Sequence, residues 1–168
     1  MRFVLGAALT SITLSLLSAT PIAAYGAGTE AREDNPSVSS EDYFSGRCVY
    51  GRTYCKNGLR IYPTPGYDPA GADWCWYDSH VRICIKWEGD YVYVKDKVSD
   101  GRSAVAEVYG PVSTWEPRSL YCRNPYGTGT WARCNFDWPE NNYYDLVAYT
   151  FNKENDDWIT RFRAYFDN

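Results

Sequence analysis

The sequence predicts an all-β protein, an antiparallel β-sandwich with disulfides and a flexible N-terminal arm. Three observations lead to this fold class: short runs of alternating apolar and polar residues, turn-forming residues between the runs, and six cysteines in 168 residues. The 16 tyrosines and 7 tryptophans suit pleated surfaces, where wide rings pack across neighbouring strands. We expect a signal peptide at residues 1–24, an acidic arm at residues 25–46 and a folded domain at residues 47–168.

The first part has the layout of a secretory signal peptide. Arg2 precedes the apolar run "FVLGAALTSITLSLLSA", and "TPIAA" then supplies small residues at a cleavage site, which we place after Ala24. A membrane anchor is the weaker interpretation, because Thr and Ser break the run. No later apolar run is long enough to cross a bilayer. The sequence therefore predicts a secreted, extracellular protein.

The second part is acidic and has no apolar pattern. Between residues 25 and 46 five carboxylates accompany Arg32 alone, and this excess of four negative charges equals the net charge of −4 of the whole chain. Nucleic-acid binding needs a basic stripe, and anionic membranes attract basic segments, so the charge argues against both partners. Three roles remain: an inert disordered leader, a propeptide, or an arm that orders on a partner. The arm ends in Tyr43 and Phe44, and an extended segment with such apolar anchors is typical of strand addition and groove insertion.

The cysteines indicate three disulfides, because their number is even and the chain is expected to be exported. Fifteen connectivities are open. Pairing of sequence neighbours is favoured, since each bond would then close a short loop between adjacent strands. The favoured pairs are Cys48 with Cys55, Cys75 with Cys84, and Cys122 with Cys134. The wide gaps and the single histidine disfavour a zinc site. We expect no metal and no cofactor.

Alternation places the strands of the folded domain. Residues 81–87 and 91–98 predict a hairpin turned by "EGD", and residues 103–110 predict a strand entered through "SDGR". Residues 119–136 predict a second hairpin with "NPYGTG" at its tip. Residues 145–151 and 158–166 predict a third, around "NKENDD". One face of its last strand is expected to carry Trp158, Thr160, Phe162, Ala164 and Phe166. The proline-rich stretch "YPTPGYDPAGADW" is expected to be a loop.

Catalytic constellations are hard to find. His80 is the one histidine, and no serine stands in a nucleophile-elbow context, so an ordinary polar side chain is the favoured interpretation. Two carboxylate pairs could serve a glycosidase, Asp137 with Glu140 and Asp156 with Asp157. Both pairs lie in turn-like sequence, where such residues are common. "NKENDD" does not fit the spacing of a calcium loop. We therefore expect that the protein is not an enzyme.

Aromatic clusters give the better functional lead. Trp74 and Trp76 in "DWCWY" point to the same face of a strand, either into the core, which is commoner for Trp, or outward as a stacking surface. Exposed rings at Trp74, Trp76 or Tyr143 would suit a carbohydrate- or wall-binding module. A rigid loop at residues 124–129, with Tyr126 at its centre, would suit a secreted hydrolase inhibitor.

Two blocks carry a resemblance to known proteins. "DGRSAVAEVYG" and "RSLYCRNPYGTGTWARCNFDWPE" resemble a large group of small exported bacterial proteins, which share a "DG-S-A-A-V" strand and a "CRN…G-GTW-RCN-D-PE" hairpin. The resemblance covers roughly residues 100–140 and, more loosely, the terminal hairpin. It implies an antiparallel β-sandwich and a disulfide between Cys122 and Cys134.

Within that group the chain is similar to the small adaptor subunit of umbrella toxin particles. These are secreted antibacterial assemblies for interbacterial competition, in which a repeat-bearing toxin chain displays lectin-like subunits through adaptors. The resemblance implies that the N-terminal segment docks in a groove of the repeat-bearing chain and that the folded domain holds the lectin-like subunit. By position, the docking segment would be Ser37, Val38, Ser39, Ser40, Glu41, Asp42, Tyr43 and Phe44. The leading hypothesis is therefore a secreted, non-catalytic adaptor, with the wall-binding module and the hydrolase inhibitor as alternatives.

Overall fold

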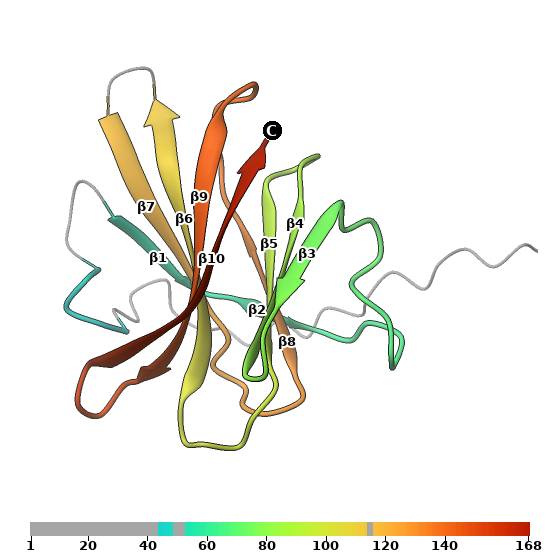
Figure 1. Ribbon diagram of the computed structural model, residues 1–168, viewed down its shortest axis with the longest axis vertical. Coiled ribbons are helices and arrows are strands. Elements are labelled where there is room, and N and C mark those ends of the chain that lie inside the picture. Colours follow the sequence, from blue (N-terminus) through green and yellow to red (C-terminus); the bar gives the residue numbers. More distant parts are fainter. Residues whose placement is uncertain (1–43, 49–52, 114–115) are drawn as a thin grey trace, which may run out of the picture.

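A computed structural model describes residues 44–48, 53–113 and 116–168. Its regular elements are ten strands, and the described residues contain no helix (Figure 1). The strands are β1 (Thr53–Asn57), β2 (Leu59–Ile61), β3 (Trp74–Tyr77), β4 (Val81–Lys86), β5 (Tyr91–Asp96), β6 (Ser103–Ser113), β7 (Glu116–Arg123), β8 (Trp131–Asn135), β9 (Tyr143–Asn152) and β10 (Asp157–Asp167). The predicted all-β class is confirmed.

The strands form two five-stranded sheets that pack face to face. The first sheet has the order β1-β7-β6-β9-β10, and the second has the order β2-β8-β5-β4-β3. Figure 1 shows them as two layers that enclose a shared interior. The expected β-sandwich is therefore present. Strands β3 and β10 end the two sheets on one side of the sandwich, where Trp76 on β3 lies 6.3 Å from Phe166 on β10.

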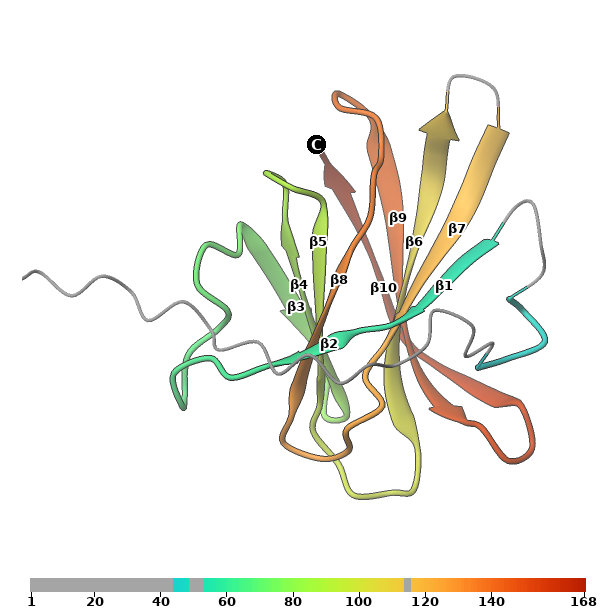
Figure 2. The same cartoon turned by 180° about the vertical axis from the view of Figure 1, so that it is seen from behind.

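Strands β1 and β2 form one run that passes from the first sheet to the second (Figure 2). Gly58 lies at the passage, where a Cβ atom would come within 2.9 Å of the Cβ of Ala132. Glycine is needed here because a second backbone crosses so closely. On the first sheet β1 pairs with β7 in parallel, whereas the other pairs are antiparallel. The expected antiparallel sandwich thus contains one parallel pair.

The interior follows from the alternation of the strands. Val81, Ile83 and Ile85 of β4 are fully buried and face the first sheet, as the hairpin pattern predicts. The first sheet contributes small and branched residues opposite them, namely Ala104, Ala106, Val108, Leu120, Leu146 and Ala148. Rings close one end of this core, from Phe136, Trp138, Tyr144 and Phe166. Burial of these apolar side chains is the main force that holds the two sheets together.

The first and third predicted hairpins are confirmed. Strands β4 and β5 pair antiparallel around a turn in which Gly89 and Asp90 have positive φ values of 89° and 54°. Strands β9 and β10 pair antiparallel along nearly their whole length. The predicted strand at residues 103–110 is the first part of β6, and residues 62–73 form the expected loop.

The predicted hairpin at residues 119–136 is wrong. Its two arms are β7 and β8, and they belong to different sheets. The connection crosses the sandwich because Asn124 is fully buried, with its amide nitrogen donating to the carbonyl oxygens of Val94 and Thr130 at 3.1 and 2.8 Å. A buried amide needs these partners, and they fix the chain between the sheets instead of at the tip of a hairpin.

The expectation that Trp158 and Thr160 share a face of the last strand with Phe162, Ala164 and Phe166 is also wrong. The pairing register of β10 against β9 shifts between Thr160 and Phe162, which is a β-bulge at Arg161. A bulge moves all later side chains to the other face. Trp158 consequently packs on the outer face of the first sheet, against Phe151, whereas Phe162, Ala164 and Phe166 line the interior.

All three favoured disulfides are confirmed. They join Cys48 with Cys55, Cys75 with Cys84, and Cys122 with Cys134. Cys75 and Cys84 lie directly opposite on β3 and β4. The third bond departs from the expectation of adjacent strands, because β7 and β8 are in different sheets, so it fastens one sheet to the other.

Candidate interaction surfaces

The described chain begins on the outer face of the first sheet with a buried ring. Phe44 is 2% exposed, and its ring centroid lies 5.7 Å from that of Phe151 and 6.2 Å from that of Trp158. Trp158 is on this face because of the bulge at Arg161. The cradle for Phe44 is therefore made by β9 and by the part of β10 that precedes the bulge.

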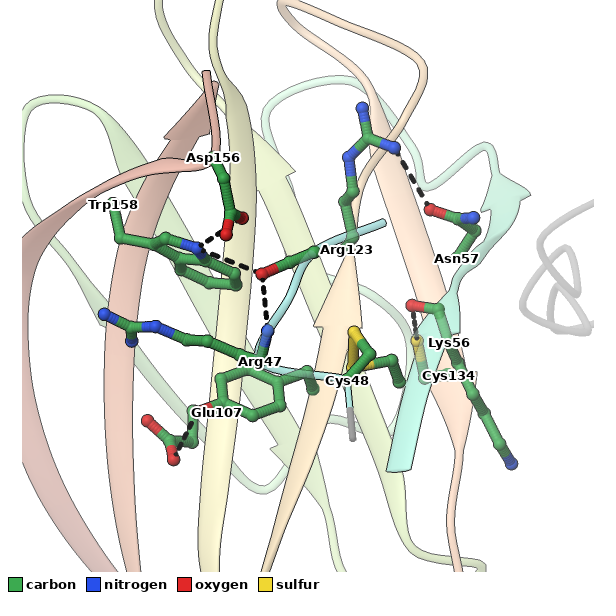
Figure 3. The surroundings of a disulfide bond; sticks show 12 residues. Arg47, Cys48, Lys56, Asn57, Glu107, Arg123, Cys134, Asp156 and Trp158 are labelled. Carbon is green, nitrogen blue, oxygen red and sulfur yellow. Dashed lines mark hydrogen bonds between the residues drawn. A yellow bond between two sulfur atoms is a disulfide. The ribbon is translucent and has the colours of Figure 1, made fainter. Parts of the chain in front are cut away.

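Residues 44–48, which we call the N-terminal cap, are held by several further contacts (Figure 3). The Trp158 indole nitrogen donates to the Ser45 hydroxyl at 3.2 Å, and the Arg47 guanidinium lies 4.5 Å from the Trp158 ring centroid. Cys48 is bonded to Cys55 of β1. A hydrogen bond from Ser45 holds the pKa of Asp156 below its ordinary value, with help from Trp158. The cap is thus fixed to both edges of one sheet.

A buried carboxylate lies on the same face of the sheet. Glu107 of β6 is 9% exposed and accepts hydrogen bonds from three hydroxyl groups. The donors are Ser119 at 2.7 Å, Tyr121 at 2.8 Å and Tyr149 at 2.6 Å. Burial, followed by the charge of Glu107, raises the pKa of Tyr121 to about 12. The three donors satisfy a charge that would otherwise be costly to bury.

The expected docking segment lies mostly before this cap. Residues 37–43 are outside the described residues, and their role stays a prediction. Phe44 is described, and its side chain contacts the protein's own sheet. In this conformation Phe44 offers no surface to a partner, so Tyr43 is the aromatic residue of the segment that is left for such a contact.

Of the two positions left open for Trp74, the commoner core position and the surface, the structure shows the surface. Trp74 is 55% exposed and stacks on Trp76, with centroids 6.4 Å apart and planes 23° from parallel. Trp76 is half-buried and packs against the core, so it supports the outer ring. Both rings are on β3, whose second edge pairs with no other strand of the two sheets. Tyr77 on the same strand is also exposed.

Tyr143 does not join this pair of tryptophans. It is 80% exposed and begins β9, in the first sheet. Its exposed aromatic neighbours on that sheet are Tyr109 and Tyr165, which both pair with Asp145 across the strands. The three rings considered for stacking are therefore divided between two sheets.

The loop at residues 124–129, which was considered as an inhibitory loop, is held by hydrogen bonds to the side chain of Asn124. The side-chain oxygen of Asn124 accepts hydrogen bonds from the Tyr126 amide at 3.0 Å and from the Thr130 hydroxyl at 3.2 Å. Gly127 and Gly129 have positive φ values of 80° and 79°, as the turn requires. These hydrogen bonds hold the loop in one conformation. The side chain of Tyr126 is half-buried, so only part of that ring is accessible to a partner.

His80 belongs to a polar cluster at the end of β3 and β4. Its Nδ1 lies 2.7 Å from the Ser79 hydroxyl and also contacts the guanidinium of Arg161. Asp78 accepts from the backbone amide of His80, not from its ring, and pairs with Arg161 at 3.0 Å. Burial raises the pKa of Asp78, but the amides of Val81 and His80 together with Arg161 outweigh it and lower the pKa. A catalytic triad needs the carboxylate on the imidazole, so this arrangement does not provide one.

The two carboxylate pairs considered for hydrolysis have structural contacts. Glu140 is exposed and accepts a hydrogen bond from Asn168 at 2.7 Å, and Asp137 is exposed. Asp157 pairs with Arg102, and Asp156 accepts from Trp158 at 3.2 Å. One group of possible metal ligands lies among the described residues, Asp68 with Cys75 and Cys84, but the two cysteines are joined in a disulfide. Their sulfur atoms are therefore not thiolate ligands.

Two of these features were absent from the sequence-based expectations. Glu107 interrupts an apolar strand, and tyrosines on the paired strands give it hydroxyl donors, but the pairing itself cannot be read from the sequence. Arg161 lies at the register shift of β10, and the alternation of the sequence does not predict its contacts with Asp78 and His80. The chain finds no counterpart among protein-family models, curated proteins or solved structures.

In the part of the chain that the structure describes, no helix has the length and apolar character needed to cross a membrane.

Proposed function

We propose that this chain is a secreted, non-catalytic interaction module that joins two macromolecules, as an adaptor in an antibacterial toxin complex. The observation that carries the proposal is the N-terminal cap. Phe44 and the Cys48–Cys55 disulfide fix the point at which residues 37–43 join the folded domain. A segment that starts from a fixed point loses less entropy when it docks than one that is tethered loosely.

The first partner is the repeat-bearing toxin chain, with a groove for residues 37–43. Tyr43 would be its aromatic anchor, and Glu41 and Asp42 would contribute charge. Extended segments bind such grooves through alternate side chains and backbone hydrogen bonds. The second partner is the lectin-like subunit, held by the folded domain. Its surface would include Trp74, since exposed tryptophans are enriched at the energetic centres of interfaces.

Replacement of the segment tests the first contact. In one variant a Gly-Ser linker of equal length replaces Ser37–Tyr43, and in the control variant the same kind of linker replaces Thr29–Asn35. Phe44 and the cap are kept in both, because removing them would disturb the fold. We expect the large partner to co-purify from the culture medium with the control only. Equal recovery with both variants would refute the docking role.

A second candidate function is carbohydrate binding by Trp74. The favouring observation is the exposed, stacked pair of Trp74 and Trp76, because flat rings pack on the apolar faces of sugars. Trp74→Ala is the suitable variant, since Trp76 also supports the core. Loss of sedimentation with purified cell-wall glycan, at unchanged thermal stability, would favour this function over the adaptor role for that surface.

A further inference from the structure

The second sheet carries a pocket that neither proposed function uses. It has a volume of about 630 Å³ and lies between the loop after β2 and the strands β5 and β8. Arg60, Tyr62, Tyr67, Lys95 and Trp131 supply its charged and aromatic walls. The volume is within the range of pockets that hold small ligands, about 300–1,000 Å³.

Two cations line this pocket without a partner of opposite charge among the described residues. The Arg60 guanidinium lies 5.1 Å from the Tyr62 ring centroid, and the Lys95 ammonium lies 5.6 Å from that of Trp131. Neither forms an ion pair with a carboxylate in the described ranges, and no Asp or Glu is among the lining residues. Nearby Asp68 is already paired with Arg82 at 2.5 Å. The charge of the pocket is therefore positive, although the chain as a whole is acidic.

The backbone that carries the aromatic walls is held in place before any ligand arrives. Tyr67 is 72% exposed on a tight turn, where its amide donates to the Thr64 carbonyl at 3.0 Å and Gly66 has a φ of 85°. Pro63 and Pro65 restrict the φ angles of this loop. Trp131 is buried beside Ile61 and forms part of the sheet surface below. Such a pre-formed site avoids part of the entropy cost of binding.

We infer that this pocket binds a short anionic saccharide. Arg60 and Lys95 would hold its carboxylate or phosphate, and the exposed rings of Tyr62 and Tyr67 would pack on the apolar faces of the sugars. A saccharide combines anionic groups with flat apolar faces in the volume available, whereas an acidic peptide would need a longer strip of cations. The inference is independent of the proposed docking segment and of Trp74, because none of those residues lines the pocket.

Calorimetric titration of the exported protein tests the inference. The probes are trigalacturonate, which carries carboxylates, and glucose 6-phosphate, which carries a phosphate on a sugar ring. Neutral chitotriose is the third probe. We expect one of the anionic probes, and not chitotriose, to bind at low salt and to bind more weakly as the salt concentration rises. The anionic probe that binds identifies which of the two chemistries the pocket selects.

A pair of matched double variants locates the binding. Arg60→Gln with Lys95→Gln removes both pocket cations and is expected to weaken binding at least tenfold. Lys153→Gln with Arg163→Gln removes the same charge from exposed positions of β10 and of the turn before it, and is expected to change binding less than twofold. Thermal unfolding of both variants verifies that they remain folded.

Four results would overturn the inference. They are equal affinity for chitotriose, no binding of either anionic probe at millimolar concentration, an equal loss in both double variants, and tighter binding of a synthetic peptide with the sequence of residues 29–42. The last result would assign the pocket to an acidic peptide. The first three results would not bear on co-purification through residues 37–43, whereas the last would place part of that segment on its own domain.

Discussion

The hydroxyl of Tyr149 donates a hydrogen bond of 2.6 Å to the carboxylate of Glu107, which lies on the neighbouring strand of the first sheet. With Tyr121 and Ser119 it completes a set of three donors around one buried charge. The outer face of this sheet is thus held by a polar network as well as by the rings of the cap.

Replacing Glu107 should therefore lower the unfolding free energy, by an amount that depends on whether the new side chain can accept hydrogen bonds. Glu107→Leu leaves the hydroxyls of Tyr121 and Tyr149 buried without their acceptor, and we expect a loss of about 3 kcal/mol in unfolding free energy. Glu107→Gln keeps an acceptor oxygen and should cost about 1 kcal/mol. Denaturant titration measures both values. A Leu variant as stable as the wild type would show that the network contributes nothing.

The anchor of the cap gives a second prediction. Phe44→Ala removes a buried ring from the cradle of Phe151 and Trp158, and we expect a loss of about 3–4 kcal/mol in unfolding free energy. Lys153→Ala in the exposed turn before β10 is the control and should change stability by less than about 0.5 kcal/mol. Equal unfolding midpoints for the two variants would contradict the packing of the cap.

A third prediction concerns the contact of Gly110 with Tyr144. A Cβ at residue 110 would come within 2.8 Å of Cε1 of the Tyr144 ring, and that ring is held by a hydrogen bond of 2.5 Å to the Pro139 carbonyl. Gly110→Ala should therefore destabilise the protein by about 2–3 kcal/mol, measured by thermal unfolding. In the control Gly46→Ala the new Cβ meets only the end of the Asp156 side chain, so we expect a small change. Comparable losses in both would refute the steric explanation.

The pH dependence of stability gives a fourth prediction. Burial raises the pKa of Asp96 to about 6, the charge of Asp100 adds to the effect, and hydrogen bonding from Val98 opposes it. The folded state then holds this proton more tightly than the unfolded state, whose pKa is about 3.9. The stability that the proton confers is complete below about pH 4 and is lost as the pH rises through about 6.

Asp96→Asn removes this titration, so stability measured at pH 5 and pH 7 separates the two proteins. We expect the variant to be more stable than the wild type at pH 7, by on the order of 1–3 kcal/mol, with a smaller difference at pH 5. An unchanged difference between the two pH values would mean that Asp96 titrates at its ordinary pKa.

The sequence predicted those parts of the fold that depend on local alternation. Val81, Ile83 and Ile85 share a face that is easily read, and the turn at Gly89 and Asp90 follows directly. The connection at Asn124 could not be predicted, because turn residues look alike whether the next strand joins the same sheet or the opposite one. What decides the connection is the hydrogen bond from the Asn124 side chain to the carbonyl of Val94 on β5, a strand of the second sheet.

The interaction surfaces were predicted only in part. The pattern placed Trp74 and Trp76 on one face, but whether that face is covered depends on the position of β3 at the edge of its sheet. Trp158 was assigned to the wrong face because a single bulged residue reverses the alternation after it. The pocket at Arg60 and Lys95 is lined by a loop and two strands that are distant in the sequence, and no local sequence pattern predicts that they lie together.

The disulfide between Cys48 and Cys55 has a mechanical consequence. If a partner pulls on the residues before Phe44, the tension passes through this covalent bond directly into β1, bypassing residues 49–52. Cys48 can then leave the sheet only together with Cys55, whose strand pairs with β7. A load applied at Phe44 is therefore carried by the first sheet as a whole and not by the segment between the two cysteines alone.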